Sequence, residues 1–448
     1  MYKYQMMFNE MERKMERRIF KEGDKIPSIQ TLAEQYGCSK STVLRMLSEL
    51  EKRHMIYSIP KSGYYVVKGK HGDEGAASSI MLDFAASTPD PDVFPYLDFQ
   101  QCINKAIDTY KNNLFRYGTQ QGLPSLIRIV QKHLASHQVF TNERNIVITS
   151  GIQQALFILS SIPFPNGKKK ILVEQPCYHL FIAILETGNI PAVGIQRTAE
   201  GIDLEELERI FRTEDIKLFY TMSRFQVPLG TAYSRQEKQK IVELARKYDV
   251  LIVEDDHLAD LEQDRKRDPL FAYDTSSHVI YLKSYSKVIF PGLRIGVAVI
   301  PDALVEIFVR YKKLQDIDSS MLSQGALEIY LKSRMFERHK EKIRSSYARR
   351  ASIMATCLKE HAGRSNGLFT FYPPDQPSIH THISLQARIP LSLLLARLQK
   401  QSILLEPIDK HYLSSFPKAN VLKLNASQVK EDEIAGGIAK IAEELRRI

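Results

Sequence analysis

The segment SYSKVIFPGLRIG, residues 284–296, brings together side chains that could do covalent chemistry. Lys287 follows a β-rich run, Ser284 and Ser286 precede it, and Arg294 lies seven residues after it. A lysine amine can form a Schiff base with an aldehyde, while hydroxyls and a cation can bind a phosphate. The pattern predicts a site for pyridoxal phosphate, although an ordinary polar loop could have the same composition.

Two further segments could complete such a site. Thr149-Ser150-Gly151-Ile152 follows a β-rich run and opens a helical one, so its backbone N–H groups could hold a phosphate at the positive end of a helix. Asp255, in VLIVEDDH, ends another β-rich run and could keep a pyridine nitrogen protonated. Taken alone, a plain strand-to-helix turn would explain the first feature equally well, and a carboxylate that caps the next helix would explain the second better.

Basic residues concentrate at the N-terminus. Residues 1–70 contain 14 Lys and Arg against 8 Asp and Glu, while the remaining 378 residues contain 48 against 44. A basic patch on a small module is typical of binding to a phosphate backbone, although it also occurs on surfaces that are merely well solvated. The N-terminal part is therefore a candidate nucleic-acid-binding module.

Within this part, residues 39–53 (SKSTVLRMLSELEKR) are predicted to form the second helix of a helix-turn-helix, which lies in the major groove. Ser39 is placed to cap the helix, and the apolar residues Val43, Leu44, Leu47 and Leu50 are expected to face inward. A β-hairpin is predicted to follow, with its tip near Lys61. The alternative is a structural three-helix bundle with solvated lysines. The residues expected to contact DNA are Ser28, Ser39, Lys40, Ser41, Thr42, Arg45, Lys61 and Gly63.

Composition divides the 448 residues into three parts. Residues 1–67 hold the predicted helices and hairpin, and the Gly-rich, charged stretch 68–80 is predicted to be a linker. In 81–448, β-rich runs alternate with helical segments, which indicates an α/β fold with a mostly parallel sheet covered by helices on both faces. From about 365 to 448 we expect a smaller α+β lobe.

Several classes of protein are excluded by composition. No stretch approaches the roughly 18 uninterrupted apolar residues of a membrane span, and the N-terminus lacks the apolar run of a signal peptide. A cytoplasmic protein without membrane contact is therefore expected. The four cysteines are scattered, so neither a disulfide framework nor a cysteine zinc site is expected.

The motifs resemble two known families. Residues 23–67 resemble the GntR-type winged helix, with Gln30 where that family often has arginine. Residues 81–448 resemble the fold type I aminotransferases through YGTQQGLPSL, VEQPCYH, QVPLG and the segment around Lys287. The two modules in this order are similar to the MocR subgroup of GntR regulators.

The resemblance implies roles for individual residues. Lys287 would carry pyridoxal phosphate covalently, Asp255 would pair with the pyridine nitrogen, and Tyr178 would stack on the ring. Gln226 would contact the side of the ring hydroxyl, and Tyr117 would reach the phosphate of the partner subunit in a homodimer. The phosphate-binding residues would be Ser150, Gly151, Ile152, Ser284, Ser286 and Arg294.

Two positions depart from the family pattern. Lys423 occupies the place of an arginine that clamps a substrate carboxylate, and lysine offers a point charge instead of a bidentate fork. His257 replaces a tyrosine shortly after Asp255; it could still hydrogen-bond the ring oxygen of the cofactor but would change the cofactor's electronics. The sequence therefore favours a transcription regulator that senses pyridoxal phosphate, an amino compound, or both. The alternatives are a working aminotransferase with an appended DNA-binding module and, less favoured because Lys287, Asp255 and Arg294 remain, a DNA-binding scaffold with an inactive pocket.

Overall fold

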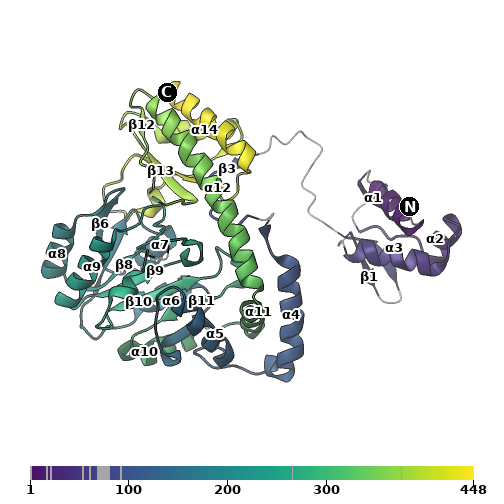
Figure 1. Ribbon diagram of the computed structural model, residues 1–448, viewed down its shortest axis with the longest axis horizontal. Coiled ribbons are helices and arrows are strands. Elements are labelled where there is room, and N and C mark those ends of the chain that lie inside the picture. Colours follow the sequence, from purple (N-terminus) through teal and green to yellow (C-terminus); the bar gives the residue numbers. More distant parts are fainter. Residues whose placement is uncertain are drawn as a thin grey trace. The chain divides into compact units, whose positions relative to one another are not determined.

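The computed structural model describes residues 3–16, 19–20, 23–52, 55–59, 62–67, 81–90, 93–264, 266–374 and 376–448. The chain forms two compact units, Met1–Ser79 and Ile80–Ile448 (Figure 1). The linker expected at 68–80 and the expected contact residue Lys61 lie outside the described residues. No helix in the described part of the chain is both long and apolar enough to cross a membrane.

The described residues of the smaller unit form three helices and a hairpin. The helices are α1 (Lys3–Glu16), α2 (Ile29–Gln35) and α3 (Lys40–Lys52), and the hairpin consists of β1 (Ile56–Ile59) and β2 (Gly63–Val66). The two strands pair antiparallel, with Ile59 opposite Gly63, so the predicted hairpin is confirmed. Gly63 has a φ of +118°, a backbone conformation that side chains disfavour and that a tight turn needs.

The core of the smaller unit corrects one expectation. The buried residues of α3 are Val43, Met46, Leu47 and Leu50, whereas the Leu44 side chain is 45% exposed. Spacings of three, four and seven residues return a helix to the same face, and Leu44 lies one step around from that face. Met46 is therefore a buried residue of this helix, whereas Leu44, which was predicted to face inward, is not.

The larger unit is built on an eight-stranded sheet with the order β4-β11-β10-β9-β8-β5-β6-β7. β10, β9, β8, β5 and β6 run parallel, and the remaining neighbours pair antiparallel, which confirms the mostly parallel sheet. The strands are β4 (Ile146–Thr149), β5 (Lys170–Gln175), β6 (Ala192–Thr198), β7 (Gly201–Ile202), β8 (Ile216–Thr221), β9 (Leu251–Asp255), β10 (Val279–Ser284) and β11 (Gly296–Val299).

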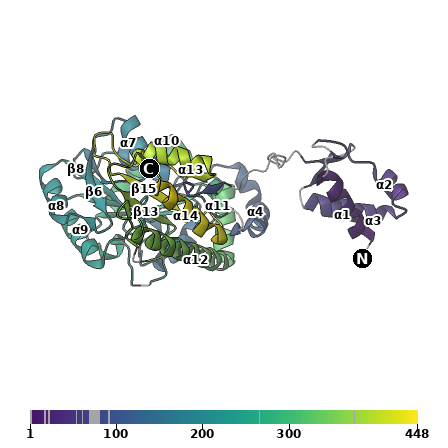
Figure 2. The same ribbon diagram turned by 90° about the horizontal axis from the view of Figure 1, so that it is seen from above.

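Both faces of this sheet are covered by helices, as Figures 1 and 2 show. Alternate strand residues such as Leu251 and Val253 pack on one face and Ile252 on the other, so the strands read as continuous apolar runs. One face packs against α6 (Ile152–Ser161), α7 (His179–Thr187) and α10 (Asp302–Gln315). The other packs against α4 (Tyr96–Tyr110), α5 (Pro124–Ala135), α8 (Leu204–Thr213), α9 (Arg235–Lys247) and α11 (Met321–Lys332).

The smaller lobe has its own three-stranded antiparallel sheet, β12-β13-β15. Its strands are β12 (Phe369–Thr370), β13 (His380–Leu385) and β15 (Val421–Asn425), and its helices are α13 (Leu391–Lys400) and α14 (Glu431–Arg446). The long helix α12 (Met335–Gly363) contributes to the apolar cores of both lobes. The start of the larger unit also joins this lobe, because β3 (Leu82–Asp83) pairs with β14 (Ile403–Leu404).

Candidate functional site

A cavity with an empty volume of about 860 Å³ lies at the carboxyl ends of the parallel strands of the larger unit. Asp255 ends β9 and Ser284 ends β10, and both line the cavity. Ligands of open α/β sheets bind at this edge, because the loops that follow the strands converge there. The small lobe closes the cavity from the opposite side with His380 of β13 and Lys423 of β15.

Lys287 lies in the loop after β10 and is partly exposed to this cavity. Its Nζ donates a hydrogen bond to the carbonyl oxygen of Ser87 at 2.5 Å. Burial, together with the nearby ammonium of Lys423, lowers the pKa of Lys287 to about 8, although the Asp255 carboxylate opposes the shift. The amine therefore has a substantial neutral, nucleophilic fraction near neutral pH.

Asp255 faces the cavity with one oxygen free. Its Oδ2 accepts a hydrogen bond from the Tyr220 hydroxyl at 2.7 Å, and its Oδ1 has no partner among the described residues. Burial raises the pKa of this carboxyl to about 7, and the Tyr220 hydrogen bond partly opposes the shift. A buried, unpaired carboxylate oxygen needs a donor, and a protonated pyridine nitrogen would satisfy it. The ring of Tyr178 lines the same cavity.

A phosphate-sized cradle lies at the start of α6. Gly151 caps this helix with a φ of +84°, and Ile152 is its first residue. This φ favours glycine, and a Cβ on Gly151 would lie 2.9 Å from Nη2 of Arg294, so a larger residue would displace the guanidinium. Arg294 donates from Nη2 to the Ser150 carbonyl at 3.1 Å, and Ser284 and Ser286 line the cavity nearby. Helix N–H groups, a guanidinium and hydroxyls fit a phosphate.

Three expected site residues lie elsewhere in the larger unit. Gln226 does not line the cavity: its amide nitrogen donates to the Pro176 carbonyl at 2.7 Å, and its amide oxygen accepts from the Leu229 N–H at 3.0 Å. Both ends of the amide are thus engaged, and Val227 lines the cavity instead. The Ser150 hydroxyl donates to Asp316 at 2.6 Å, away from the cavity.

Tyr117 is the third. It is 78% exposed and does not line the cavity of its own chain. Its expected role concerns a second subunit, so this chain alone leaves that role a prediction. His257, by contrast, does line the cavity, with both ring nitrogens unpartnered among the described residues. Burial lowers the pKa of His257 to about 3, so the ring is neutral.

The structure adds cavity residues that the sequence did not single out. His380 and His411 come from separate parts of the small lobe, and His179 begins α7. Met222 and Val227 supply an apolar wall. The only signal in the sequence was the alternation His380-Thr381-His382, which places the two histidines on one face of a strand but does not say what that face meets.

Most of the expected DNA-contacting residues lie at the start of α3 and in its first two turns, namely Ser39, Lys40, Ser41, Thr42 and Arg45. Ser39 accepts a hydrogen bond from the Thr42 N–H at 3.3 Å, which confirms the predicted cap. Lys40, Ser41 and Arg45 are exposed, and the Arg45 guanidinium lies 4.4 Å from the ring centre of Tyr4. Ser28 caps α2 through the Thr31 N–H.

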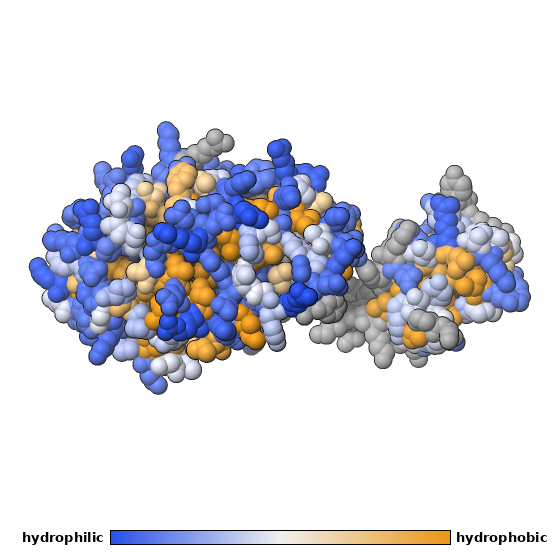
Figure 3. Space-filling model, turned by 90° about the horizontal axis from the view of Figure 1, so that it is seen from below, coloured by the Kyte–Doolittle hydropathy of each residue, from blue (hydrophilic) through white to orange (hydrophobic). Residues whose placement is uncertain are grey.

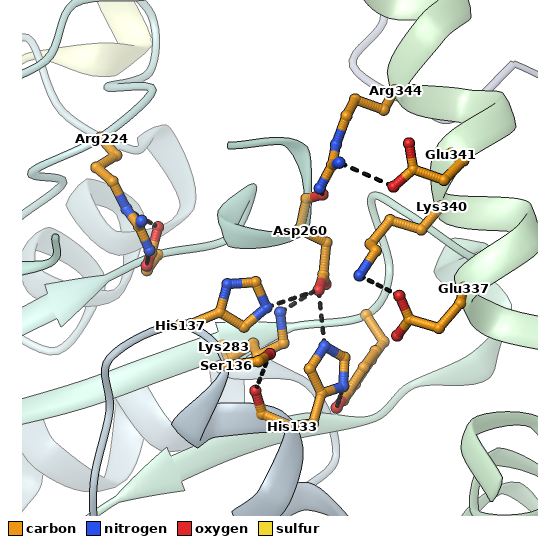
Figure 4. Close-up of polar contacts among 12 residues, drawn as sticks. His133, Ser136, His137, Arg224, Asp260, Lys283, Glu337, Lys340, Glu341 and Arg344 are labelled. Atoms are coloured by element: carbon orange, nitrogen blue, oxygen red, sulfur yellow. Dashed lines mark hydrogen bonds and ion pairs between the residues drawn. The ribbon is translucent and has the colours of Figure 1, made fainter. Parts of the chain in front are cut away.

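A second polar cluster surrounds the buried Asp260 and includes Lys283 of β10 (Figure 4). Its Oδ1 accepts from Nε2 of His133 and His137 at 2.9 and 3.0 Å, and its Oδ2 pairs with Lys283 at 2.5 Å. The Arg344 guanidinium donates to the Asp260 carbonyl at 3.0 Å. These partners satisfy both carboxylate oxygens and connect β10 to α5 and α12, so the cluster supports the strand that leads to Lys287.

Family models match both units. The model for aminotransferase class I and II matches residues 80–429, and the model for the bacterial regulatory proteins of the gntR family matches residues 3–66. A GntR-type DNA-binding unit joined to a pyridoxal phosphate-dependent aminotransferase fold defines the class. The chain belongs to the GntR-family transcription regulators of the MocR type, which carry this fused aminotransferase-like domain.

Individual relatives agree with this assignment. The chain is 57% identical to the HTH-type transcriptional regulator YcxD of Bacillus subtilis (strain 168), over 99% of this chain and all of that protein. It is 26% identical to the aromatic-amino-acid aminotransferase 1 of Thermococcus litoralis, over 82% of this chain and 89% of that protein. The crystal structure of kynurenine aminotransferase from Pyrococcus horikoshii with PMP superposes with a TM-score of 0.76 and 26% identity, covering 83% of this chain and 92% of that one.

Proposed function

We propose that this regulator senses an amino compound through pyridoxal phosphate held at Lys287, and that ligand binding in the cavity changes how residues 1–67 bind an operator. The observation that carries the proposal is the shared cavity: Lys287, Asp255, Arg294 and the start of α6 all line it. These groups fit the aldehyde, the ring nitrogen and the phosphate of one cofactor. The domain boundaries that we propose are 1–67, 68–80 and 81–448.

The cofactor would supply an aldehyde for amines and an electron-withdrawing ring. The chain would do the rest. Lys287 would bind the aldehyde carbon, and the Asp255 carboxylate would keep the proton on the ring nitrogen. Arg294 and the N–H groups at Gly151 and Ile152 would neutralise the phosphate. Lys423 would attract the carboxylate of an entering amino acid with a single point charge.

A sensor fits this cavity better than an efficient aminotransferase. Sensing needs only a ligand that favours one conformation, whereas turnover needs the substrate fixed while a proton moves at its α-carbon. Lysine at position 423 fixes a carboxylate less firmly than arginine does, and Val227 offers no hydrogen bond to the ring. Aminotransferase activity remains the second candidate, because Lys287 is available as the base.

We also propose a homodimer in which Tyr117 of one subunit reaches the site of the other. Exposed apolar residues support an interface beside Tyr117: Leu314, Ile317 and Leu322 are 79%, 43% and 39% exposed. The Gly118 N–H donates to Asp318, so residues 117 and 317 lie in adjoining segments. Figure 3 shows that hydrophobic side chains also gather in several patches on one face of the larger unit.

Sedimentation velocity would test this interface. Leu314→Glu should shift the larger species toward the monomer, whereas the exposed Phe140→Glu, outside the 314–322 segment, should leave the distribution unchanged. A wild-type protein that sediments only as a monomer at micromolar concentration would contradict the proposed dimer.

DNA binding would be measured on a duplex selected from a random pool by the wild-type protein. We expect Arg45→Ala to weaken binding several-fold and Lys40→Ala to reduce the salt slope by about one unit. Lys240→Ala, on the exposed side of α9, is the matched control. The ligand-dependent step would be tested by repeating the titration with pyridoxal phosphate and a panel of amino acids. Unchanged operator affinity under every ligand condition would contradict the sensor proposal, and binding that is insensitive to salt would contradict the proposed phosphate contacts.

A further inference from the structure

The small-lobe wall of the cavity is polar on one face of its sheet and apolar on the other. In the register of β13 and β15, His380 lies opposite Asn425, and His382 opposite Lys423. Paired residues of antiparallel strands point to the same side, so these four polar residues share one face. The other face carries Ile383, Leu422 and Leu424, which pack into the lobe's core. The fold therefore places a row of buried polar side chains on the side of this sheet that faces the cavity.

His380 presents a hydrogen-bond donor from this wall. Asn425 Oδ1 accepts from the Ser427 N–H at 2.8 Å, which fixes the amide so that its Nδ2 donates to His380 Nδ1 at 3.0 Å. Burial lowers the pKa of His380 well below its usual value, so the ring is neutral and its proton is on Nε2. That Nε2–H is buried and has no partner among the described residues.

His411 presents the opposite polarity. Its Nδ1 donates to the Cys177 carbonyl at 2.7 Å, while the Cys177 N–H donates back to the His411 carbonyl at 2.8 Å. Burial lowers the pKa of His411 to about 3, so the neutral ring leaves a bare lone pair on Nε2. This nitrogen also has no partner in the described part of the chain. It can be satisfied only by a group that donates a hydrogen bond.

Lys423 adds a cation to the two imidazoles. Lys423 is only 4% exposed and makes no hydrogen bond or ion pair within the described residues; burial lowers the pKa of its amine, and the more distant carboxylates of Glu406 and Asp83 oppose the shift. A buried, unpaired charge is costly, so the cavity is complementary to an anion at this point. A carboxylate could accept from both the Lys423 ammonium and the His380 Nε2–H. The hydrogen-bond donor that Nε2 of His411 needs must come from another part of the ligand.

We propose that His380, His411 and Lys423 form a recognition subsite that selects an amino acid bearing a side-chain hydroxyl or amide. This inference rests on the proposed pyridoxal phosphate site, because the ligand's amine would be directed to the aldehyde carbon of a cofactor held at Lys287. Its carboxylate would lie against Lys423 and His380, and its side-chain O–H or N–H would donate to Nε2 of His411. An aliphatic side chain of the same shape would leave that nitrogen unpaired.

The test compares ligands of equal shape on the cofactor-loaded wild-type protein. Threonine and valine differ by a hydroxyl in place of a methyl group, and asparagine and leucine form a similar pair. Dissociation constants would come from visible-spectrum titrations. We expect the polar member of each pair to bind about tenfold more tightly or better, because the aliphatic member leaves a buried acceptor unsatisfied. Equal affinities for threonine and valine would overturn the proposal.

Variants at position 411 test whether His411 causes the preference for threonine over valine. His411→Phe keeps a planar ring but removes the acceptor, so it should erase the threonine preference and leave valine affinity within about twofold. His411→Gln can still donate to the Cys177 carbonyl and offer an oxygen to the ligand, so it should keep part of the preference. It also provides the readout if the phenylalanine variant does not fold. The control is His278→Gln, whose histidine pairs with Asp249 away from the cavity.

The outcomes separate this inference from the proposed function. If the protein takes up no pyridoxal phosphate that borohydride fixes to Lys287, the proposed function fails. If the cofactor is fixed but the threonine preference survives in both His411 variants at full strength, the cofactor site stands and the recognition subsite is wrong. Lys423→Met should weaken all amino acids in the panel while leaving simple primary amines unaffected, and equal weakening of both would overturn the carboxylate assignment.

Discussion

The two sides of the cavity differ in how their cations are held. On the cofactor side, Lys287 and Arg294 each donate to a backbone carbonyl, and Asp255 accepts from Tyr220. On the small-lobe side, Lys423 has no partner within the described residues, and His380 and His411 each keep one nitrogen unpaired. Lys287 and Arg294, the cations of the first side, are thus bonded to the backbone before any ligand enters, whereas Asp255 Oδ1 and both His257 nitrogens have no partner among the described residues. The second leaves its hydrogen-bonding capacity for the ligand, which suits a surface that selects.

The largest expected effect is the loss of covalent cofactor attachment on the cofactor side of the cavity. Lys287→Ala should abolish the borohydride-stable attachment of pyridoxal phosphate, because no other lysine of the cavity lies in the loop after β10. Mass spectrometry of the reduced protein measures the adduct, and Lys240→Ala on the surface is the control. A full adduct in Lys287→Ala would show that another lysine, such as Lys423, is the attachment point.

A smaller effect is expected from the ring partner. Asp255→Asn should weaken pyridoxal phosphate binding by roughly 10- to 150-fold, since a charge-assisted hydrogen bond is worth about 1.5–3 kcal/mol. Equilibrium absorbance titrations of the cofactor-free protein measure the affinity. The control Asp302→Asn removes an exposed partner of Arg144 and should change nothing. Wild-type affinity in Asp255→Asn would show that this carboxylate does not pair with the ring nitrogen.

The pH dependence of cofactor capture connects the two sides. Burial first, and then Lys423, lowers the pKa of Lys287 to about 8. Only the neutral amine attacks an aldehyde, so the capture rate of the cofactor-free protein should rise about tenfold per pH unit below pH 8 and level off above it. Lys423→Met removes one cause of the shift, so its plateau should begin at a higher pH. Stopped-flow absorbance measures both profiles, and identical profiles would show that Lys423 does not influence Lys287.

The smallest effect concerns turnover. Lys423→Arg offers a second, parallel hydrogen bond to a carboxylate and should accelerate conversion to the pyridoxamine form by up to about tenfold, at about 1.4 kcal/mol per factor of ten. Single-turnover absorbance with a panel of amino acids measures this rate. Lys410→Arg, on a partly exposed residue paired with Glu406, is the control. Rapid wild-type conversion that the arginine does not improve would favour the aminotransferase over the sensor.

Much of the cofactor side could be predicted from local sequence. Asp255 ends a strand, and Lys287 and the Gly151 turn follow within three residues of one, so strand ends and residue types indicate their place. The same local signals identified the Ser39 cap and the hairpin in the smaller unit. Where the structure places a residue differently from the expectation, the shift is one position. Leu44 lies one residue from the buried face of α3, and Gln226 lies one residue from Val227, which lines the cavity.

The sequence by itself determined the order of the modules, the parallel sheet and the reactive lysine, because helix periodicity, strand runs and caps depend on neighbours within a few residues. Only the tertiary structure decided which side chains share the cavity's far wall. His380, His411 and Lys423 come from β13, from the turn at Asp409–His411, and from β15. The hydrogen bonds of Asn425 and Cys177 then fix which imidazole nitrogen faces outward without a partner. Such convergence depends on the packing of distant segments, which no local pattern encodes.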